Sequence, residues 1–220
     1  NECGFGLIGG HTSEGSELAL GFTLNRVADR PQLLTKQGLQ PGDRLIITKP
    51  LGTGTLFASD MRSQAQGRWI SQALQHMLQS NYQASRILTA AGAHACTDIT
   101  GFGLLGHLHE MLNGSGLGAR LWLEKLPPME GALPCLRAGL FSSLHPQNRK
   151  FEHSINNLDE FSHDIATELL FDPQTAGGLL AAVSSDQADS VIAELQAAGY
   201  TTACAIGSVR QEGHDSVWLM

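Results

Sequence analysis

Hydrophobic residues along the chain recur at the spacings of short strands and helices, without a regular strand–helix–strand repeat. Short apolar runs or alternation predict strands, and apolar residues three and four apart predict helices. Strands are expected at residues 17–28, 43–49, 94–98, 119–123, 202–209 and 216–219, with another beginning near Gly177. Helices are expected at residues 55–61, 69–78, 82–91, 104–113, 131–139, 164–170 and 185–198. This mixture predicts an α+β fold.

Two polar stretches interrupt the pattern. Residues 31–42 contain proline and end in Pro41-Gly42, which is typical of a link between domains. Residues 142–163 have little periodicity, and a loop of that length is usually functional or mobile. We therefore expect a domain boundary near residue 40 and a long loop late in the chain.

Residues 97–107 carry the most informative chemistry. A short apolar strand leads to Asp98 and then to a tight turn with Gly101 and Gly103 before an apolar helix. Glycine lets backbone N–H groups approach an anion, and the helix points its positive end there. An acid beside such a turn can hold a divalent cation that bridges phosphate oxygens. The pattern fits a magnesium–phosphate site, and it also fits a plain strand-to-helix connection with Asp98 as the helix N-cap.

Other polar residues allow two interpretations each. His11 follows two glycines and either contacts phosphate or caps a turn. Lys49 precedes a glycine turn, but in a Walker A loop glycine comes before the lysine, so we interpret Lys49 as structural. Asp172 stands before a proline, a pair that more often starts a turn than lines a site.

The histidines do not form an evident metal site. His107 and His109 lie two apart on the expected helix and point to different faces, so at least one is a surface or core residue. Three more share the long polar stretch without the spacing of a rigid metal site, namely His145, His153 and His163. Arg149 and Lys150 in that stretch either meet an anionic substrate or belong to a solvated loop, which we favour.

Composition restricts the partners. The 14 Lys and Arg against 21 Asp and Glu give a net charge of −7 without a basic cluster, which argues against nucleic acid. ATP remains possible, because backbone N–H groups and a bound cation can neutralise a triphosphate. No apolar run reaches the roughly 20 residues that span a membrane. Cys96 and Cys135 lie in apolar segments and are expected to be buried free thiols, as in the reducing cytoplasm.

Four motifs together resemble one family. They are Gly9-Gly10-His11-Thr12, Lys49-Pro50-Leu51-Gly52-Thr53-Gly54, Thr97-Asp98-Ile99-Thr100-Gly101-Phe102-Gly103-Leu104-Leu105-Gly106-His107 and Asp172-Pro173-Gln174-Thr175-Ala176-Gly177-Gly178-Leu179-Leu180. Their sequence and order resemble the ATP-using superfamily of aminoimidazole ribonucleotide synthetase, and within it the selenide, water dikinases (selenophosphate synthetases). The purine enzyme typically has His where this chain has Asp98.

The resemblance implies a fold and a reaction. Residues 41–220 would be the carboxy-terminal domain, a layered α/β/α sandwich, and residues 1–40 a remnant of the amino-terminal ATP-binding domain with its linker. The family's reaction converts ATP, selenide and water into selenophosphate, AMP and phosphate. The resemblance assigns Asp98 as a Mg²⁺ ligand. It also assigns Gly9, Gly10, His11 and Thr12 to nucleotide binding, often from the neighbouring subunit of a homodimer.

Family members also carry an amino-terminal catalytic Cys or selenocysteine, a Lys and metal-binding Asp residues. None of these precedes Gly9 here, and Cys3 is no substitute. We therefore expect a fragment without catalytic residues, inactive alone. Two alternatives stay open: a sister enzyme (aminoimidazole ribonucleotide synthetase, thiamine-monophosphate kinase or the hydrogenase-maturation carbamoyl dehydratase), or a non-catalytic module of a multidomain fusion. Asn25-Arg26, where the family has a glycine, leaves the domain junction open.

Overall fold

The computed structural model describes residues 6–25, 27, 33–211 and 215–220, in two compact units, Asn1–Leu33 and Leu34–Met220. The described part of the first unit contains neither helix nor strand, so the strand expected at residues 17–28 is wrong as far as it is described. Leu18 and Phe22 are exposed. A strand is stable only when a neighbour pairs with its backbone and covers its apolar face, and the described residues of this unit supply no such neighbour.

The second unit is built on one six-stranded sheet with the order β2-β4-β1-β5-β3-β6. The strands are β1 (Arg44–Ile47), β2 (Ala95–Asp98), β3 (Gly118–Leu121), β4 (Leu179–Val183), β5 (Cys204–Arg210) and β6 (Val217–Leu219). Neighbours run antiparallel except β3 and β6, which are parallel. The strands expected in this unit are confirmed to within a few residues.

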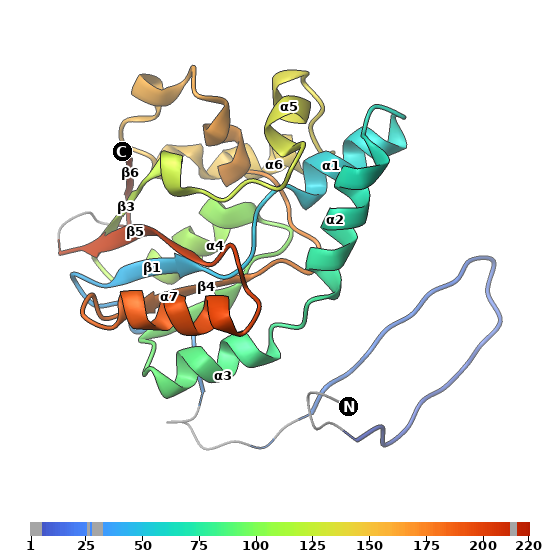
Figure 1. Cartoon of the computed structure of the whole chain (residues 1–220), viewed down its shortest axis with the longest axis horizontal. Coiled ribbons are helices and arrows are strands. Elements are labelled where there is room, and N and C mark those ends of the chain that lie inside the picture. Colours follow the sequence, from blue (N-terminus) through green and yellow to red (C-terminus); the bar gives the residue numbers. More distant parts are fainter. Residues whose placement is uncertain (1–5, 26, 28–32, 212–214) are drawn as a thin grey trace. The chain divides into compact units, whose positions relative to one another are not determined.

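Helices surround this sheet (Figure 1). The α-helices are α1 (Thr53–Met61), α2 (Gly67–Leu78), α3 (Tyr82–Ala90), α4 (Gly103–Leu112), α5 (Ala132–Arg137), α6 (His145–Asn148) and α7 (Ala188–Ala197). The 3-10 helices are η2 (Leu123–Lys125), η3 (Arg149–Ser154), η4 (Leu158–Phe161) and η5 (Ile165–Leu170). Among the described residues, no helix is both long and apolar enough to cross a bilayer.

The sheet separates two hydrophobic cores. Ile46 of β1 packs on the face covered by α3 and α7, whereas its neighbours Leu45 and Ile47 pack on the face covered by α4. All five residues of β4 are buried. Strands covered on both faces are apolar throughout rather than alternating. The layered α/β/α arrangement expected from the resemblance is thus confirmed.

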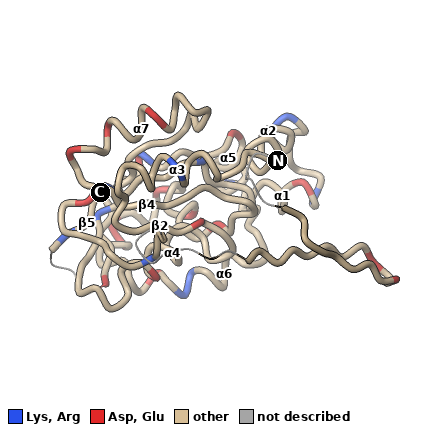
Figure 2. Tube along the Cα trace, turned by 90° about the horizontal axis from the view of Figure 1, so that it is seen from below, with Lys and Arg blue, Asp and Glu red and all other residues tan. Residues whose placement is uncertain are grey.

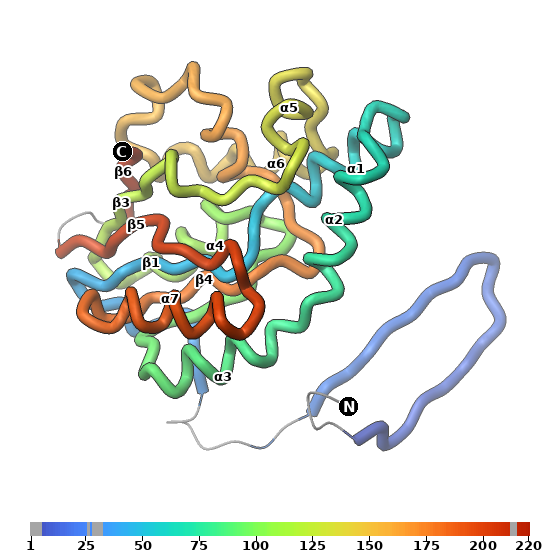
Figure 3. Tube along the Cα trace, viewed as in Figure 1, coloured from blue at the N-terminus to red at the C-terminus, as the bar shows by residue number. Residues whose placement is uncertain are grey.

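The polar stretch at residues 142–163 is ordered, which corrects the expectation of a long loop. It contains α6, η3 and η4, which precede β4 in the chain. The stretch is coloured yellow to orange in Figure 3. His145, Asn148 and Ile155 are buried. These helices are only four to six residues long, so tertiary contacts rather than apolar periodicity stabilise them.

Charged residues are scattered along the trace. Lys and Arg positions in Figure 2 alternate with Asp and Glu positions on many elements and form no continuous basic stripe over the described residues.

Candidate functional site

Three of the four motifs meet where the neighbouring strands β2, β4 and β1 end or begin. In the β-ladders, Asp98 at the end of β2 pairs with Leu179 at the start of β4, and Ile47 at the end of β1 pairs with Leu180. The segments that follow β1 and β2 and the one that precedes β4 therefore emerge side by side. They are the Lys49–Gly54, Thr97–His107 and Asp172–Leu180 motifs.

Hydrogen bonds lock the first and last of these motifs together. The Gln174 Oε1 atom accepts hydrogen bonds from the backbone N–H groups of Gly52 at 3.1 Å and Thr53 at 3.3 Å. The Gly54 N–H donates to the Pro173 carbonyl at 3.0 Å. A Cβ on Gly54 would lie 2.5 Å from that carbonyl oxygen, so only glycine allows this approach. The N–H groups at the start of α1 are thus used internally and are not open to an anion.

The two glycines of the turn before α4 have different roles. Gly103 has a φ of +70°, and a Cβ there would lie 2.9 Å from the Leu170 carbonyl oxygen. A Cβ on Gly101 would meet no atom within 4 Å. Within the described part of the chain, the backbone N–H groups of Gly101 and Phe102 donate no hydrogen bond. The turn therefore offers two unused donors on an open side, which suits an anion.

Asp98 lies at the end of β2 with an exposed side chain. Helix α4 starts five residues later, and its N-cap residue Phe102 makes no side-chain cap, so the N-cap interpretation of Asp98 is wrong. Its carboxylate has no hydrogen-bond or ion-pair partner among the residues described. Burial, and next the Asp98 charge, raise the pKa of Cys96 to about 12.

Asp98 by itself is an incomplete metal site. No group of three or more His, Cys, Asp or Glu side chains in the described residues is arranged to hold a metal ion. An exposed, unpaired carboxylate is the oxygen donor that Mg²⁺ prefers, and Mg²⁺ is usually held by one or two carboxylates plus phosphate oxygens and waters. Asp98 fits one position of such a site.

A series of hydrogen-bonded side chains extends from the turn through His107 and Glu110 to Lys36. The Nε2 atom of buried His107 accepts a hydrogen bond from the Thr100 N–H at 3.0 Å. The His107 Nδ1 atom lies 3.0 Å from Glu110 Oε2, which accepts a bond from Lys36 Nζ at 2.8 Å. His109 instead packs against the Phe151 ring at 5.7 Å, so the two histidines serve different surroundings, as their spacing predicts.

Lys49 is a structural residue in this arrangement. Its side chain is buried, and Nζ donates to the carbonyl oxygens of Gln79 at 2.5 Å and Ala176 at 3.1 Å. Burial lowers the pKa of Lys49. The amine thereby ties the end of β1 to the segment before β4, and it is not presented to a phosphate.

Asp172 is a buried acid that sequence reasoning did not single out as such. Its Oδ1 atom accepts a hydrogen bond from Thr55 Oγ1 at 2.7 Å, and its Oδ2 atom accepts one from Gln174 Nε2 at 3.0 Å. Burial raises the pKa of Asp172 to about 6, although these hydrogen bonds and nearby His145 oppose the shift. Through its hydrogen bond with Thr55, Asp172 connects α1 to the loop before β4.

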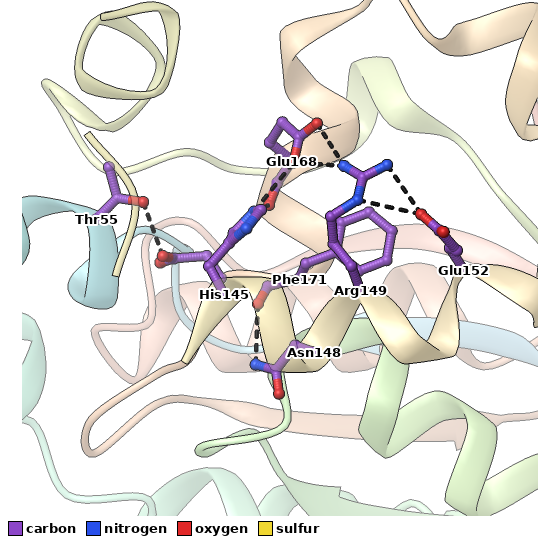
Figure 4. Close-up of polar contacts among 8 residues, drawn as sticks. Thr55, His145, Asn148, Arg149, Glu152, Glu168 and Phe171 are labelled. Atoms are coloured by element: carbon purple, nitrogen blue, oxygen red, sulfur yellow. Dashed lines mark hydrogen bonds and ion pairs between the residues drawn. The ribbon is translucent and has the colours of Figure 1, made fainter. Parts of the chain in front are cut away.

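Arg149 is partly exposed and is paired with acidic side chains of this chain (Figure 4). Its guanidinium lies 2.7 Å from Glu168 and 2.9 Å from Glu152, and 4.9 Å from the centre of the Phe171 ring. His145 also contacts Glu168, at 3.0 Å. Arg149 thus belongs to an ordered helix rather than to a loop, and although its side chain is 38% exposed, its charge is paired with acids of this chain.

Asn148 joins the polar stretch to the turn, as the close-up shows in part (Figure 4). Its buried Nδ2 atom donates to the carbonyl oxygens of Gly101 at 2.8 Å and Phe171 at 3.0 Å. Sequence reasoning missed this residue, because an asparagine in an aperiodic polar stretch carries no signal of its own. A cavity of about 490 Å³ opens beside Gly101, between α1 and residues 142–144.

Gly9, Gly10, His11 and Thr12 belong to the first unit, where they are exposed. Their assignment to nucleotide binding stays a prediction. Cys96 and Cys135 are buried free thiols, as expected.

The layered α/β/α fold and the three motifs at one end of its sheet define a class of protein, and comparison with known proteins shows which family this class is. Residues 40–220 match the family described as AIR synthase related protein, C-terminal domain, and the chain belongs to this family. It is 39% identical over 211 residues to the selenide, water dikinase of Pelobacter propionicus, covering 96% of this chain and 61% of that protein. It is 32% identical over 218 residues to the selenide, water dikinase of Caldanaerobacter subterraneus subsp. tengcongensis, covering 99% and 63%.

The chain thus spans less than two thirds of the length of these relatives. Among solved structures, Escherichia coli HypE, a hydrogenase maturation protein, has a TM-score of 0.57 at 20% identity, covering 85% of this chain and 48% of that one. Thiamine monophosphate kinase from Aquifex aeolicus has a TM-score of 0.53 at 16% identity, covering 84% and 52%. These structures establish the fold.

Proposed function

We propose that this chain is the carboxy-terminal part of a selenide, water dikinase and supplies part of its phosphate and Mg²⁺ site. One observation carries the proposal: the unpaired carboxylate of Asp98 lies in the same motif as the two unused N–H donors of Gly101 and Phe102. A carboxylate for a hard cation next to donors for an anion suits a metal-bound phosphate. The reaction would be that of the relatives, with ATP, selenide and water as substrates.

Each residue has a defined task in this proposal. Asp98 would be one ligand of Mg²⁺, and the Gly101 and Phe102 N–H groups would donate to phosphate oxygens. When bound, Mg²⁺ would offset the negative charge that phosphoryl transfer concentrates on oxygen. The described residues at this turn include no activated nucleophile, because Lys49 is buried and both ring nitrogens of His107 are engaged. Reacting groups are therefore expected from another part of the full-length enzyme.

The remaining contacts would come from Gly9, Gly10, His11 and Thr12, either in the same chain or in the second subunit of a homodimer. HypE has been solved in complex with ATP, and thiamine monophosphate kinase in complex with AMPPCP and TMP. Those proteins share this fold at 18% and 16% identity. They support nucleotide binding as the general use of the fold. The buried free thiols Cys96 and Cys135 favour a reducing, cytoplasmic location.

A sister enzyme of the same fold is the second candidate, and a non-catalytic module of a fusion is the third. Identity favours the dikinase, because the dikinases reach 39% whereas the HypE and kinase structures compared above stay at 20% or below. The activity itself is tested in the longer protein that includes the amino-terminal part. Selenide-dependent formation of AMP supports the dikinase, and phosphorylation of another acceptor supports a sister enzyme.

Calorimetry on this chain tests its share of the site. We expect binding of ATP with Mg²⁺ that weakens at least about tenfold in Asp98→Ala, the loss of about one charge-assisted contact. Asp186→Ala is the matched control, an exposed acid beyond the opposite end of β4. Equal binding by the wild type and Asp98→Ala contradicts the proposed site. Formation of AMP by this chain alone contradicts the prediction that it is inactive without its missing part.

A further inference from the structure

The turn at residues 100–102 is held from several sides. The Thr100 N–H donates to His107 Nε2, and the Thr100 carbonyl accepts bonds from the N–H groups of Gln174 at 2.9 Å and Gly103 at 3.1 Å. The Gly101 carbonyl accepts the bond from Asn148 Nδ2 at 2.8 Å. These hydrogen bonds use the Thr100 N–H and the carbonyl oxygens of Thr100 and Gly101. They leave unused the N–H groups of Gly101 and Phe102, which are the two proposed to bind phosphate.

The hydrogen bonds also define the proton on His107. A backbone N–H can only donate, so the Nε2 atom that faces Thr100 must present its lone pair. The proton of the neutral ring then sits on Nδ1 and is donated to Glu110. Lys36 donates to the same Glu110 oxygen and keeps this carboxylate charged, since these contacts lower the pKa of Glu110 against the effect of burial.

We propose that His107 is a positioning residue of the phosphate site, oriented by Glu110 and Lys36 and assisted by Asn148. This inference rests on the proposed function of the turn. His107 fixes the Ile99–Thr100 peptide at the start of the turn. The N–H groups of Gln174 and Gly103 hold the carbonyl of the Thr100–Gly101 peptide, and Asn148 holds that of the Gly101–Phe102 peptide. These two later peptides carry the N–H groups of Gly101 and Phe102, so both donors are held before any ligand arrives, and His107 contributes by anchoring the residue at which the turn begins. Donors fixed in advance need no reorganisation when the anion binds, which is how such groups act most strongly.

Three substitutions separate positioning from simple filling of the core. His107→Phe keeps a ring of similar shape and removes the acceptor. His107→Gln places a carbonyl oxygen near the position of Nε2 and restores the acceptor. His109→Phe is the matched control, because it makes the same change two residues further along α4, on a side chain that packs against Phe151 and His153.

The first measurement is nuclear magnetic resonance of the ligand-free chain. We expect the nitrogen shifts of the His107 ring to report the Nδ1–H tautomer, and amide exchange at Thr100 to rise about tenfold in His107→Phe. Glutamine at 107 should return exchange to within about threefold of wild type, and His109→Phe should leave it unchanged. Should His107→Phe not fold, Glu110→Ala tests the same chain from the surface, with a gain of the Nε2–H tautomer as the expected result.

The second measurement is the affinity for ATP with Mg²⁺ in the same variants. It should weaken about tenfold in His107→Phe and recover in His107→Gln. A His107 ring protonated at Nε2 in the wild type, or unchanged Thr100 exchange in His107→Phe, overturns the inference. If Thr100 exchange responds as expected but Asp98→Ala binds nucleotide like the wild type, the positioning contact stands and the proposed function fails.

Discussion

Gly101 and Gly103 show how two identical residues, two positions apart, meet different physical demands. Gly103 needs a positive φ and close contact with the backbone of the η5 segment, whereas the position of a Cβ on Gly101 is open. The motif letters alone cannot distinguish these roles. The first is a requirement of folding, and the second leaves room for a ligand.

This difference makes a matched pair of substitutions. Gly103→Ala should lower the free energy of unfolding by about 2 kcal/mol or more, because it adds a strained φ and a contact of 2.9 Å with Leu170. Gly101→Ala should change it by less than about 1 kcal/mol while weakening binding of ATP with Mg²⁺, since the methyl group crowds the N–H donors. Urea unfolding and calorimetry measure the two effects. Equal destabilisation by both substitutions would contradict this assignment.

Asp172 gives a prediction for pH. Its pKa is about 6 when folded, against 3.8 for the free side chain, so the folded state binds the proton more tightly. Between these values the unfolded chain loses its proton first, and the free energy of unfolding should fall as pH rises, by on the order of 3 kcal/mol in total. Above about pH 6 this contribution is constant.

Asp172→Asn should remove this dependence, since the amide does not ionise and its oxygen still accepts from Thr55. The measurement is urea unfolding of the wild type and the variant between about pH 4 and pH 7, and the quantity compared is the difference between their free energies of unfolding at each pH. Asp189→Asn on the exposed side of α7 is the control, and its difference in free energy of unfolding from the wild type should not change with pH. A flat difference for Asp172→Asn would show that this carboxyl group does not carry the effect.

At the scale of elements, α6 and η3 are held by charge and packing rather than by their own propensity. Arg149 connects η3 to Glu168 on η5 and lies against Phe171, while Asn148 connects α6 to the turn. The segment thereby forms a support behind the proposed site. It also shows why a polar stretch without periodicity need not be a mobile loop.

Arg149→Met should loosen this support. We expect faster hydrogen exchange across residues 142–163 and a loss of about 1–2 kcal/mol in the free energy of unfolding, because two acids lose their partner. Arg68→Met is the control, since its ion pair with Glu130 is largely exposed and worth under about 0.5 kcal/mol. Unchanged exchange across the segment in Arg149→Met would mean that packing alone orders it.

At the scale of the whole molecule, the chain divides into a first unit without described helix or strand and a second unit with two hydrophobic cores. All buried residues of both cores come from residue 39 onward. The second unit therefore has what an independently stable domain needs.

Deletion of residues 1–33 should leave the second unit folded, with a Tm within about 2 °C of the full chain, since the buried residues of its two described cores all lie from residue 39 onward. Circular dichroism during heating measures this. The shortened chain retains Lys36 and therefore the contact to Glu110. Loss of cooperative unfolding would contradict the division, and unchanged affinity for ATP with Mg²⁺ would argue against a role for His11 in this chain.

The sequence by itself determined most helices and strands of the second unit, because apolar periodicity is a local property. It also determined the family, since four motifs in a fixed order are specific, and it pointed to Asp98. The strand expected around Leu18 and Phe22 failed because a strand depends on a neighbour that no local pattern supplies.

Only the tertiary structure decided which motif residues face a ligand and which hold the protein together. Gln174 contacts Thr53, and Asp172 contacts Thr55, across more than one hundred residues of chain. His107 and Asn148 act on the same turn from different elements. Hydrogen bonds and ion pairs form between atoms that are close in space, and the folding of the sheet brings those atoms together. For this reason the letters of a motif predict a site, while its geometry has to come from the fold.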